Sequence, residues 1–451
     1  MQQRARRVGW GRRLMHQVTC PNCWHLFYPE EVLFVSRHEE LLGDPILGPE
    51  EYRRFLPVRF NVSGEALDAK GLPTSDLACP RCHLPIPQPM MELPPLYISL
   101  VGSPACGKSY FLTTMVWELR RLLPQARLSF SDADPMANSP IHEYEQTLFM
   151  NLQPTEPTEI RKTQTDDPRL YRTSRINDAQ VRFPVPLQFS LQPTPQHPSI
   201  GRKRWIGRIV VLYDNAGEDF LPGGGDQVGS ATVQHLAKSQ ILLTMFDPTQ
   251  EPSFRAICKS DDPQLTVGLR PKQQGAGALL FRQETVLTEA ARRIRRYLGI
   301  SQEKRIKQPL IVIVPKFDLW EEMSGISLDV PPYEPGDASQ PLRVKMDSVE
   351  RVSGALRSLI QGLSPEYVAG VDSLSERVRF VPVSSLGRSP EYIRRDNTAF
   401  YGIRPKDIRP KWVTVPLIYC LARWAPGMFQ VLDSSGDSPL DLGGPGGSEG
   451  Q

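Results

Sequence analysis

The stretch from Leu96 to Ser109 constrains the fold of this chain more than any other part of the sequence. An apolar run from Leu96 to Val101 (LYISLV) leads directly into Gly102 to Ser109 (GSPACGKS), which has the form G-x-x-x-x-G-K-S. This pattern is typical of a Walker A motif, or P-loop, which lies between a strand and a helix and wraps phosphate in backbone N–H groups. The residues that follow carry apolar side chains at helical spacing up to Pro124, where the helix is expected to end. The sequence therefore predicts a nucleotide-binding loop in an α/β fold.

The residues of this loop have expected roles. Lys108 would contact the β- and γ-phosphates, and the hydroxyl of Ser109 would bind Mg²⁺. The other loop residues assigned to nucleotide binding are Gly102, Ser103, Ala105, Cys106, Gly107 and Tyr110.

Composition narrows the class of protein. The chain has 451 residues, of which 40% are hydrophobic, and a formal net charge of only +3. The chain is long enough for several domains. Its small net charge does not create the strong positive electrostatic field that is typical of nucleic-acid-binding proteins. The sequence contains no apolar run of the ~20 residues that a membrane helix needs. Its Arg-rich N-terminal segment is not followed by the apolar stretch that a secretory signal peptide would have. We expect a cytoplasmic protein without a membrane partner, in which residues 1–19 form a disordered basic tail.

Four of the seven cysteines form two C-P-x-C pairs, Cys20/Cys23 and Cys79/Cys82. Two such turns can present four thiolates to one tetrahedral zinc ion, and a site closed by four protein ligands is structural. The pairs lie much farther apart than the ~15–20 residues of a plain ribbon. Residues 20–84 are therefore predicted to form a zinc ribbon that contains an insertion. Nucleic-acid contact, if present, would be confined to this ribbon or to the basic N-terminus.

Residues 96–424 are predicted to form one nucleotide-binding domain. Short apolar runs that alternate with helical patterns indicate an α/β fold with a doubly wound, mostly parallel sheet. After the first strand, further strands are expected at 186–191, 209–213, 241–246, 310–314 and 378–383, and helices at 287–298, 344–363 and 413–424. Residues 124–185, 249–283 and 319–343 show weak periodicity and are predicted to be long loops. Residues 425–451 are rich in Pro, Gly, Ser and Asp and are predicted to be a disordered tail.

Polar motifs follow three of these strands, at the sheet edge where α/β proteins bind ligands. Asp214, in DNAGE, could hold Mg²⁺ through water, and the N–H of Gly217 could approach a γ-phosphate. In PKFD, the Asp318 carboxylate could accept two hydrogen bonds from guanine, while the Lys316 stem would cover the base. Ser384 and Ser385, in VSSLG, could present backbone N–H groups to the guanine O6.

The motifs GSPACGKS, DNAGE, PKFD and VSSLG resemble, in this order, those of GTPases of the translation-factor and Ras-like class. Together with the C-P-x-C ribbon, the insertions and the stretch from Ile408 to Leu417, they are similar to the bacterial double-GTPase (type 2) proteins. The resemblance implies GTP or GDP and Mg²⁺ as ligands, with Lys108, Asp214, Gly217 and Glu218 as the catalytic group. It also implies a molecular switch that regulates a bacterial multi-protein system of the conflict or defence kind, with protein partners such as a second GTPase.

The chain departs from the pattern of that class in three places. Pro315 stands where Asn or Thr is usual, which removes a hydrogen bond between the PKFD segment and the P-loop. Glu218 replaces the usual water-positioning Gln, so slow hydrolysis is expected. The threonine that would sense the γ-phosphate stays open among Thr155, Thr158, Thr163 and Thr165, and Arg161 and Arg169 are candidates for an arginine that assists hydrolysis.

Two other functions fit part of the sequence. A P-loop ATPase would keep Gly102, Lys108, Ser109 and Asp214. The positions of Lys316 and Asp318 would then be coincidental. A zinc-ribbon interaction scaffold could be built on a nucleotide-binding domain that no longer turns over its ligand.

Overall fold

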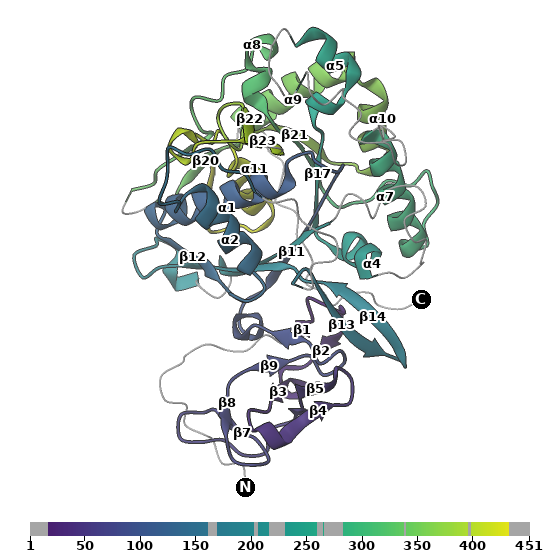
Figure 1. Cartoon of the computed structure of the whole chain (residues 1–451), viewed down its shortest axis with the longest axis vertical. Coiled ribbons are helices and arrows are strands. Elements are labelled where there is room, and N and C mark those ends of the chain that lie inside the picture. Colours follow the sequence, from purple (N-terminus) through teal and green to yellow (C-terminus); the bar gives the residue numbers. More distant parts are fainter. Residues whose placement is uncertain are drawn as a thin grey trace.

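The computed structural model describes residues 17–160, 169–202, 206–215, 231–258, 265, 283–337, 340–395 and 398–432. Gly217 and Glu218, the threonines at 163 and 165, and Arg161 lie outside these ranges, as do residues 1–16 and 433–451. Within them, α/β layers form the upper body in Figure 1, and a smaller unit of short strands lies below it.

A seven-stranded, mostly parallel sheet organises the described part of the chain. Its strands, in spatial order, are β12 (Leu128–Asp132), β15 (Leu187–Pro193), β16 (Arg208–Asp214), β11 (Pro95–Gly102), β17 (Ile241–Met245), β18 (Leu310–Val314) and β21 (Val378–Pro382). The five strands from β16 to β21 run parallel, whereas β12 and β15 are antiparallel to their neighbours. The apolar runs predicted all of these strands except β12, because strands covered on both faces have few polar positions.

Helices cover both faces of the sheet (Figure 1). On one face lie α1 (Lys108–Gln125), α2 (Ser139–Leu148) and α11 (Val415–Trp424); on the other lie α4 (Ala231–Lys238), α7 (Gln283–Leu298) and α10 (Pro365–Leu374). Helix α9 (Met346–Leu363) precedes α10 in the connection from β18 to β21 and packs on β21. Pro124 lies in the last turn of α1, which ends at Gln125, one residue beyond the predicted stop.

The segment 124–185 is largely structured, contrary to the prediction of a long loop. It contains edge strand β12 and helix α2, followed by the hairpin of β13 (Tyr171–Ile176) and β14 (Ala179–Pro184). Arg120 of α1 holds the first two elements through ion pairs of 2.9 Å to Asp132 and 3.2 Å to Glu145. The folding of β12 and α2 therefore depends on ion pairs with a residue of another helix, and the local pattern of apolar residues does not reveal such contacts.

The predicted tails are also ordered at their inner ends. Val18–Thr19 form β1, and Gln430–Leu432 form β24 beside β20 (Arg343–Lys345). The expected disorder from residue 425 is wrong up to residue 432, because Met428 is fully buried and anchors the segment in the core.

The N-terminal unit is built from two hairpins of the same form. β1 pairs with β2 (Leu26–Phe27), and β9 (Leu77–Ala78) pairs with β10 (Pro85–Ile86), with one C-P-x-C turn in each hairpin. The insertion between them contains β3 (Leu33–Val35), β4 (Leu42–Asp44), β5 (Gly48–Tyr52), β6 (Arg54–Phe55), β7 (Ala66–Leu67) and β8 (Pro73–Thr74). We call this unit, residues 17–86, the ribbon.

The ribbon packs on the large sheet, and the two share one apolar cluster. Successive side chains of a strand point to opposite faces, and Tyr97 of β11 and Tyr213 of β16 point toward the ribbon side, as do Ile209 and Val211. Residues 87–94, between the ribbon and β11, include the buried side chains of Met90, Met91 and Leu93, so this proline-rich stretch is packed against the body.

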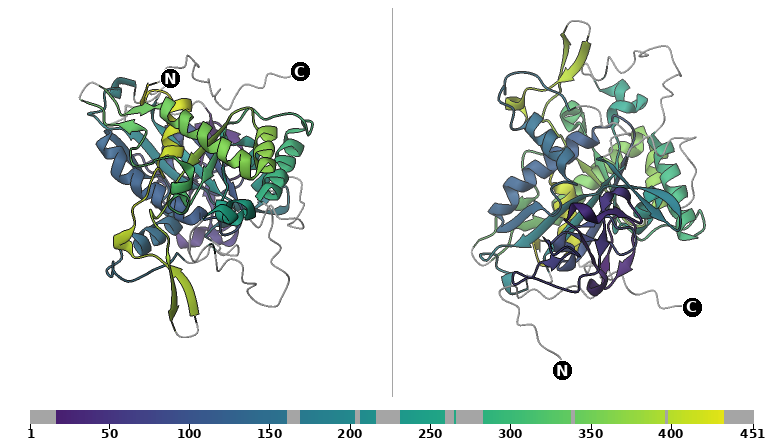
Figure 2. Two further views of the ribbon diagram at one scale, coloured as in Figure 1. Left: turned by 90° about the horizontal axis from the view of Figure 1, so that it is seen from above. Right: turned by 60° about the horizontal axis from the view of Figure 1, so that its bottom comes forward.

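The remaining elements lie at the periphery. They are α5 (Pro252–Ile257), α8 (Glu321–Ser324), β19 (Tyr333–Glu334), which pairs with β20, and a hairpin of β22 (Glu391–Arg395) and β23 (Thr398–Gly402). This last hairpin projects from the body in both views of Figure 2. Among the described residues, no helix combines the length and apolar character needed to cross a membrane.

Candidate functional site

The loop between β11 and α1, Gly102–Ser109, is termed the glycine loop. Its backbone is left-handed at Ala105 (φ 60°) and Gly107 (φ 92°), which curls the chain into the start of α1. Gly102 admits no side chain, since a Cβ there would lie 2.9 Å from the sulfur of Cys106 and 3.1 Å from Cβ of Met245. The loop therefore has the compact shape that can enclose an anion at a helix N-terminus.

Lys108 closes the glycine loop on itself. Its ammonium donates hydrogen bonds to the carbonyl oxygens of Gly102 (2.9 Å) and Ser103 (3.1 Å). A phosphate can replace these carbonyls as the partner of the ammonium. Tyr110, assigned to the nucleotide by sequence, uses its hydroxyl elsewhere, where it accepts a 3.0 Å hydrogen bond from the backbone N–H of Ile160.

Asp214 lies at the end of β16, beside the glycine loop. It is paired in register with Leu100 of β11, and Asn215 fixes the strand end by donating a 2.8 Å hydrogen bond to the Leu100 carbonyl. The carboxylate of Asp214 is exposed, yet enough protein surrounds it for desolvation to raise its pKa to about 6, against the opposing effect of the Lys108 charge. A carboxylate so placed can hold a divalent cation near bound phosphate.

The segment Pro315–Asp318, termed the PKFD loop, follows β18 at the same edge. Lys316 has a left-handed backbone (φ 58°), and Asp318 accepts a short hydrogen bond from the hydroxyl of Ser384. That hydroxyl in turn accepts a 2.8 Å hydrogen bond from the N–H of Gly387. The structure thus brings Asp318 together with the Ser384 hydroxyl. The Ser384 N–H, which the sequence assigned to the guanine O6, donates instead to the Lys411 carbonyl at 3.0 Å, and Ser385 lies buried next to it.

Sequence reasoning missed a further element at this edge, Asp247–Gln250, termed the DPTQ loop. It follows β17 and lies between the glycine loop and the PKFD loop. Lys316 donates to the Asp247 carboxylate (2.7 Å) and the Thr249 hydroxyl (2.8 Å). The signal was present, because an aspartate directly follows an apolar strand here as it does at Asp214.

The four ribbon cysteines converge on one point. Their sulfur atoms all lie within 4.8 Å of one another, and the Cys20–Cys82 and Cys23–Cys79 distances are both 3.7 Å. Zinc–sulfur bonds of about 2.3 Å place tetrahedral sulfurs about 3.8 Å apart, so the cluster fits a zinc ion. All four side chains are buried, and without a cation burial raises the pKa of the Cys20 thiol well above its usual value.

The two cysteine turns have matching backbones. The residues after the second cysteines, Trp24 and His83, both have φ of 59°. In each turn an N–H two residues after the first cysteine donates to its sulfur at 3.4 Å, from Asn22 to Cys20 and from Arg81 to Cys79. His83 is engaged by Asp44 at 2.9 Å, so it does not replace a cysteine as a ligand.

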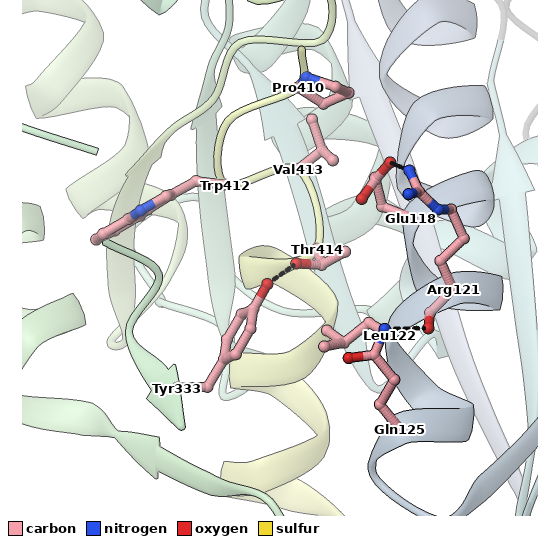
Figure 3. A pocket seen from close by; sticks show the side chains of 9 residues that line it. All are labelled: Glu118, Arg121, Leu122, Gln125, Tyr333, Pro410, Trp412, Val413 and Thr414. Atoms are coloured by element: carbon pink, nitrogen blue, oxygen red, sulfur yellow. Dashed lines mark hydrogen bonds and ion pairs between the residues drawn. The ribbon is translucent and has the colours of Figure 1, made fainter. Parts of the chain in front are cut away.

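A separate hollow of about 170 Å³ lies against the last turns of α1 (Figure 3). Its walls include Glu118 and Arg121, which form a 3.1 Å ion pair, and Tyr333 and Thr414, whose hydroxyls lie 3.0 Å apart. Because it adjoins the end of α1 opposite the glycine loop, this hollow is no part of the site at the strand ends.

Comparison with known proteins finds a curated protein that is similar to part of this chain. No protein-family model matches the chain. A curated protein from Mycolicibacterium smegmatis, described as a putative ESX-1 scaffolding and assembly protein, SaeC, is 27% identical over 194 residues. The match spans 43% of this chain and 43% of that relative, so the two correspond over less than half of either length.

Solved structures of a GTPase-like domain are similar to part of the chain. The Ski7 domain of S. cerevisiae bound to GTP shares 12% identity, with a TM-score of 0.24 over 67% of this chain and 48% of that one. The same domain bound to GDP and inorganic phosphate shares 13% identity, at the same TM-score, over 65% and 44%. At this TM-score the similarity carries no weight for function.

Proposed function

We propose that this chain is a GTP-binding molecular switch that hydrolyses GTP slowly and carries a structural zinc ribbon. The main support is the convergence of four chain segments at one edge of the parallel sheet. The glycine loop, Asp214, the PKFD loop and Ser384 are separated in sequence but follow neighbouring strands, whose carboxyl ends meet there. Phosphate, metal and base contacts can therefore be made at once.

Each segment would contact a different part of the nucleotide. The glycine loop and Lys108 would hold the phosphates, while Ser109 and Asp214 would hold Mg²⁺. Asp318 would select guanine, because its carboxylate complements the N1–H and N2–H₂ donors that adenine lacks. The hydrogen bond from Ser384 orients this carboxylate. Gly217 and Glu218 would act at the γ-phosphate, as the resemblance of DNAGE to the GTPase motif implies.

A competition experiment between GTP and ATP tests this proposal. In the presence of Mg²⁺ we expect guanine nucleotides to bind at least about tenfold more tightly, since adenine offers Asp318 no pair of N–H donors such as the N1–H and N2–H₂ of guanine. Asp318→Asn should shift the preference toward xanthine nucleotides. Asp372→Asn is a matched control, because Asp372 pairs with Arg357 on the surface formed by α9 and α10. Equal affinities of the parent for ATP and GTP would favour a P-loop ATPase.

The wider role that we propose is regulation within a bacterial multi-protein system, as in the double-GTPase proteins. The partial relative supports a role in assembly, because it is described as a putative scaffolding and assembly protein. That description also favours a second candidate function, an interaction scaffold in which bound nucleotide is not turned over. Partner capture in the GTP and GDP states separates the two: a switch requires state-dependent binding, whereas a scaffold binds equally in both.

A further inference from the structure

We propose that Gln250 is a positioning residue of the nucleotide site, which fixes the glycine loop relative to the PKFD loop. This inference rests on the proposed function and deepens it. Pro315 has neither a backbone N–H nor a polar side chain, and its carbonyl accepts a 3.1 Å hydrogen bond from the Trp320 indole, so it does not tie the PKFD loop to the glycine loop. The DPTQ loop supplies another connection between the same two segments.

One end of this connection holds the PKFD loop. Asp247 is fully buried, and one of its carboxylate oxygens accepts the 2.7 Å hydrogen bond from Lys316. Its other oxygen accepts hydrogen bonds from the N–H (2.9 Å) and the hydroxyl (2.7 Å) of Thr249. The Thr249 hydroxyl thus donates to Asp247 while it accepts from Lys316, so both of its roles are fixed.

The other end holds the glycine loop. The side-chain oxygen of Gln250 accepts a 2.8 Å hydrogen bond from the hydroxyl of Ser103, and its side-chain nitrogen donates to the carbonyl of Pro104 at 3.0 Å. An amide is needed for this pair of bonds, because one atom must accept and the other must donate. Gln250 is therefore hydrogen-bonded to two consecutive residues of the glycine loop.

The backbone of the DPTQ loop is itself held by the side chain of Gln283, at the start of α7. The N–H of Asp247 donates to the side-chain oxygen of Gln283 at 2.7 Å, and the Gln283 nitrogen donates to the Asp247 carbonyl at 2.9 Å. Within the loop, the N–H of Gln250 donates to the Asp247 carbonyl at 3.0 Å. The DPTQ loop is thus a rigid bridge whose two ends contact the two segments that a nucleotide would join.

The functional consequence concerns simultaneous binding of base and phosphates. A nucleotide bound at both loops gains from their fixed separation, since the second contact is made at high effective concentration. A looser DPTQ loop lowers affinity through this effect only when Asp318 also binds the base, because only then are both contacts made at once. The effect of Gln250 on affinity must therefore depend on Asp318, although these two side chains belong to different loops.

A double-mutant cycle on the full chain tests the inference, with GDP in the presence of Mg²⁺ as ligand. Gln250→Met keeps the length of the side chain and removes both hydrogen bonds. We expect it to weaken GDP binding about tenfold in the parent and less than about twofold in an Asp318→Ala background. Gln308→Met is the control; it removes a comparable bond to the Ala237 carbonyl (2.8 Å) near the opposite end of β18 and should leave GDP affinity unchanged.

The outcomes separate this inference from the function on which it rests. If the parent binds GDP and Gln250→Met weakens binding equally in both backgrounds, or not at all, the positioning role is overturned while the proposed function stands. If the parent binds no guanine nucleotide, both are overturned. Thermal unfolding without nucleotide gives a further criterion, because a merely structural role would lower the midpoint of Gln250→Met far below that of Gln308→Met.

Discussion

The hydroxyl of Tyr213 donates a 2.5 Å hydrogen bond to the carbonyl oxygen of Pro21. Pro21 lies between Cys20 and Cys23 in the first cysteine turn, and Tyr213 directly precedes Asp214 at the end of β16. Tyr97 of the neighbouring strand makes a similar bond, 2.9 Å long, to the carbonyl of Thr19. The first cysteine turn is thus joined to the two central strands that lead into the candidate nucleotide site.

Removing the Tyr213 hydroxyl should weaken this junction. Tyr213→Phe keeps the buried ring but leaves the Pro21 carbonyl without its partner, which costs about 1–3 kcal/mol. We expect a lower free energy of unfolding and faster transfer of zinc to a chelator, measured with a colorimetric zinc indicator. Tyr392→Phe, on the projecting hairpin, is the control. Identical zinc-transfer rates for parent and Tyr213→Phe would show that the hydroxyl does not hold the turn.

The cysteine cluster should bind about one zinc per chain. Cys79→Ser removes one of four ligands, and we expect loss of zinc together with a lower midpoint of thermal unfolding, because structural zinc contributes directly to folding. The loss of stability should reach the large sheet, since the cluster shares its apolar core with Tyr97 and Tyr213. Cys258→Ser, outside the cluster, should retain zinc. Metal analysis that finds no zinc in chain purified without chelator would contradict the assignment.

His235 should make the chain sensitive to acid. It stacks on Tyr213 with ring centroids 4.3 Å apart, neither ring nitrogen has a hydrogen-bond partner among the described residues, and burial lowers its pKa to about 3. The unfolded chain binds a proton at this residue below about pH 6.5 that the folded chain excludes. The free energy of unfolding should therefore fall with decreasing pH between about 6.5 and 3.

The His235 contribution has a maximum slope of about 1.4 kcal/mol per pH unit. His235→Phe keeps an aromatic ring on Tyr213 and does not titrate, so subtracting its unfolding profile removes the other titrating groups. Parallel profiles for the parent and His235→Phe between pH 6 and 4 would contradict this account.

Asp214 should link metal binding to pH. Its pKa is raised to about 6, so the carboxyl is largely protonated below that pH and charged above it. Because Mg²⁺ binds the charged form, the increase in GTP affinity produced by Mg²⁺ should grow between about pH 5 and 7 and then level off. Asp214→Asn should abolish this Mg²⁺-dependent increase at every pH. A parent protein whose Mg²⁺ effect is constant across this range would rule out Asp214 as the titrating group.

Glu218 should limit hydrolysis. A carboxylate can accept a hydrogen bond from the attacking water but places negative charge near the charge that develops in the transition state. We expect single-turnover hydrolysis by the isolated chain to be far slower than about 1 s⁻¹, and Glu218→Gln to accelerate it. Fast turnover that the substitution does not raise would contradict the role of Glu218.

The sequence was sufficient to predict the core strands and the cysteine pairs. A strand buried on both faces, such as Leu310–Val314, is a continuous apolar run, and its assignment needs no knowledge of its neighbours. The conformation of the glycine loop also follows from nearby residues, because its glycines and the preceding strand favour the curled backbone. By contrast, β12 and α2 were missed, since their order depends on ion pairs to Arg120 of a different helix.

Only the tertiary structure revealed the DPTQ loop as a bridge and the ribbon as a cover for the sheet. The bonds that define them join residues far apart in sequence: Ser103 with Gln250, 147 positions on, and Pro21 with Tyr213, 192 positions on. The hydrophobic and turn patterns of a segment determine its own conformation, because they act over a few residues. Which segments meet is decided by burial and hydrogen bonding across the whole chain, so the pairing of Pro21 with Tyr213 exists only once the sheet has formed.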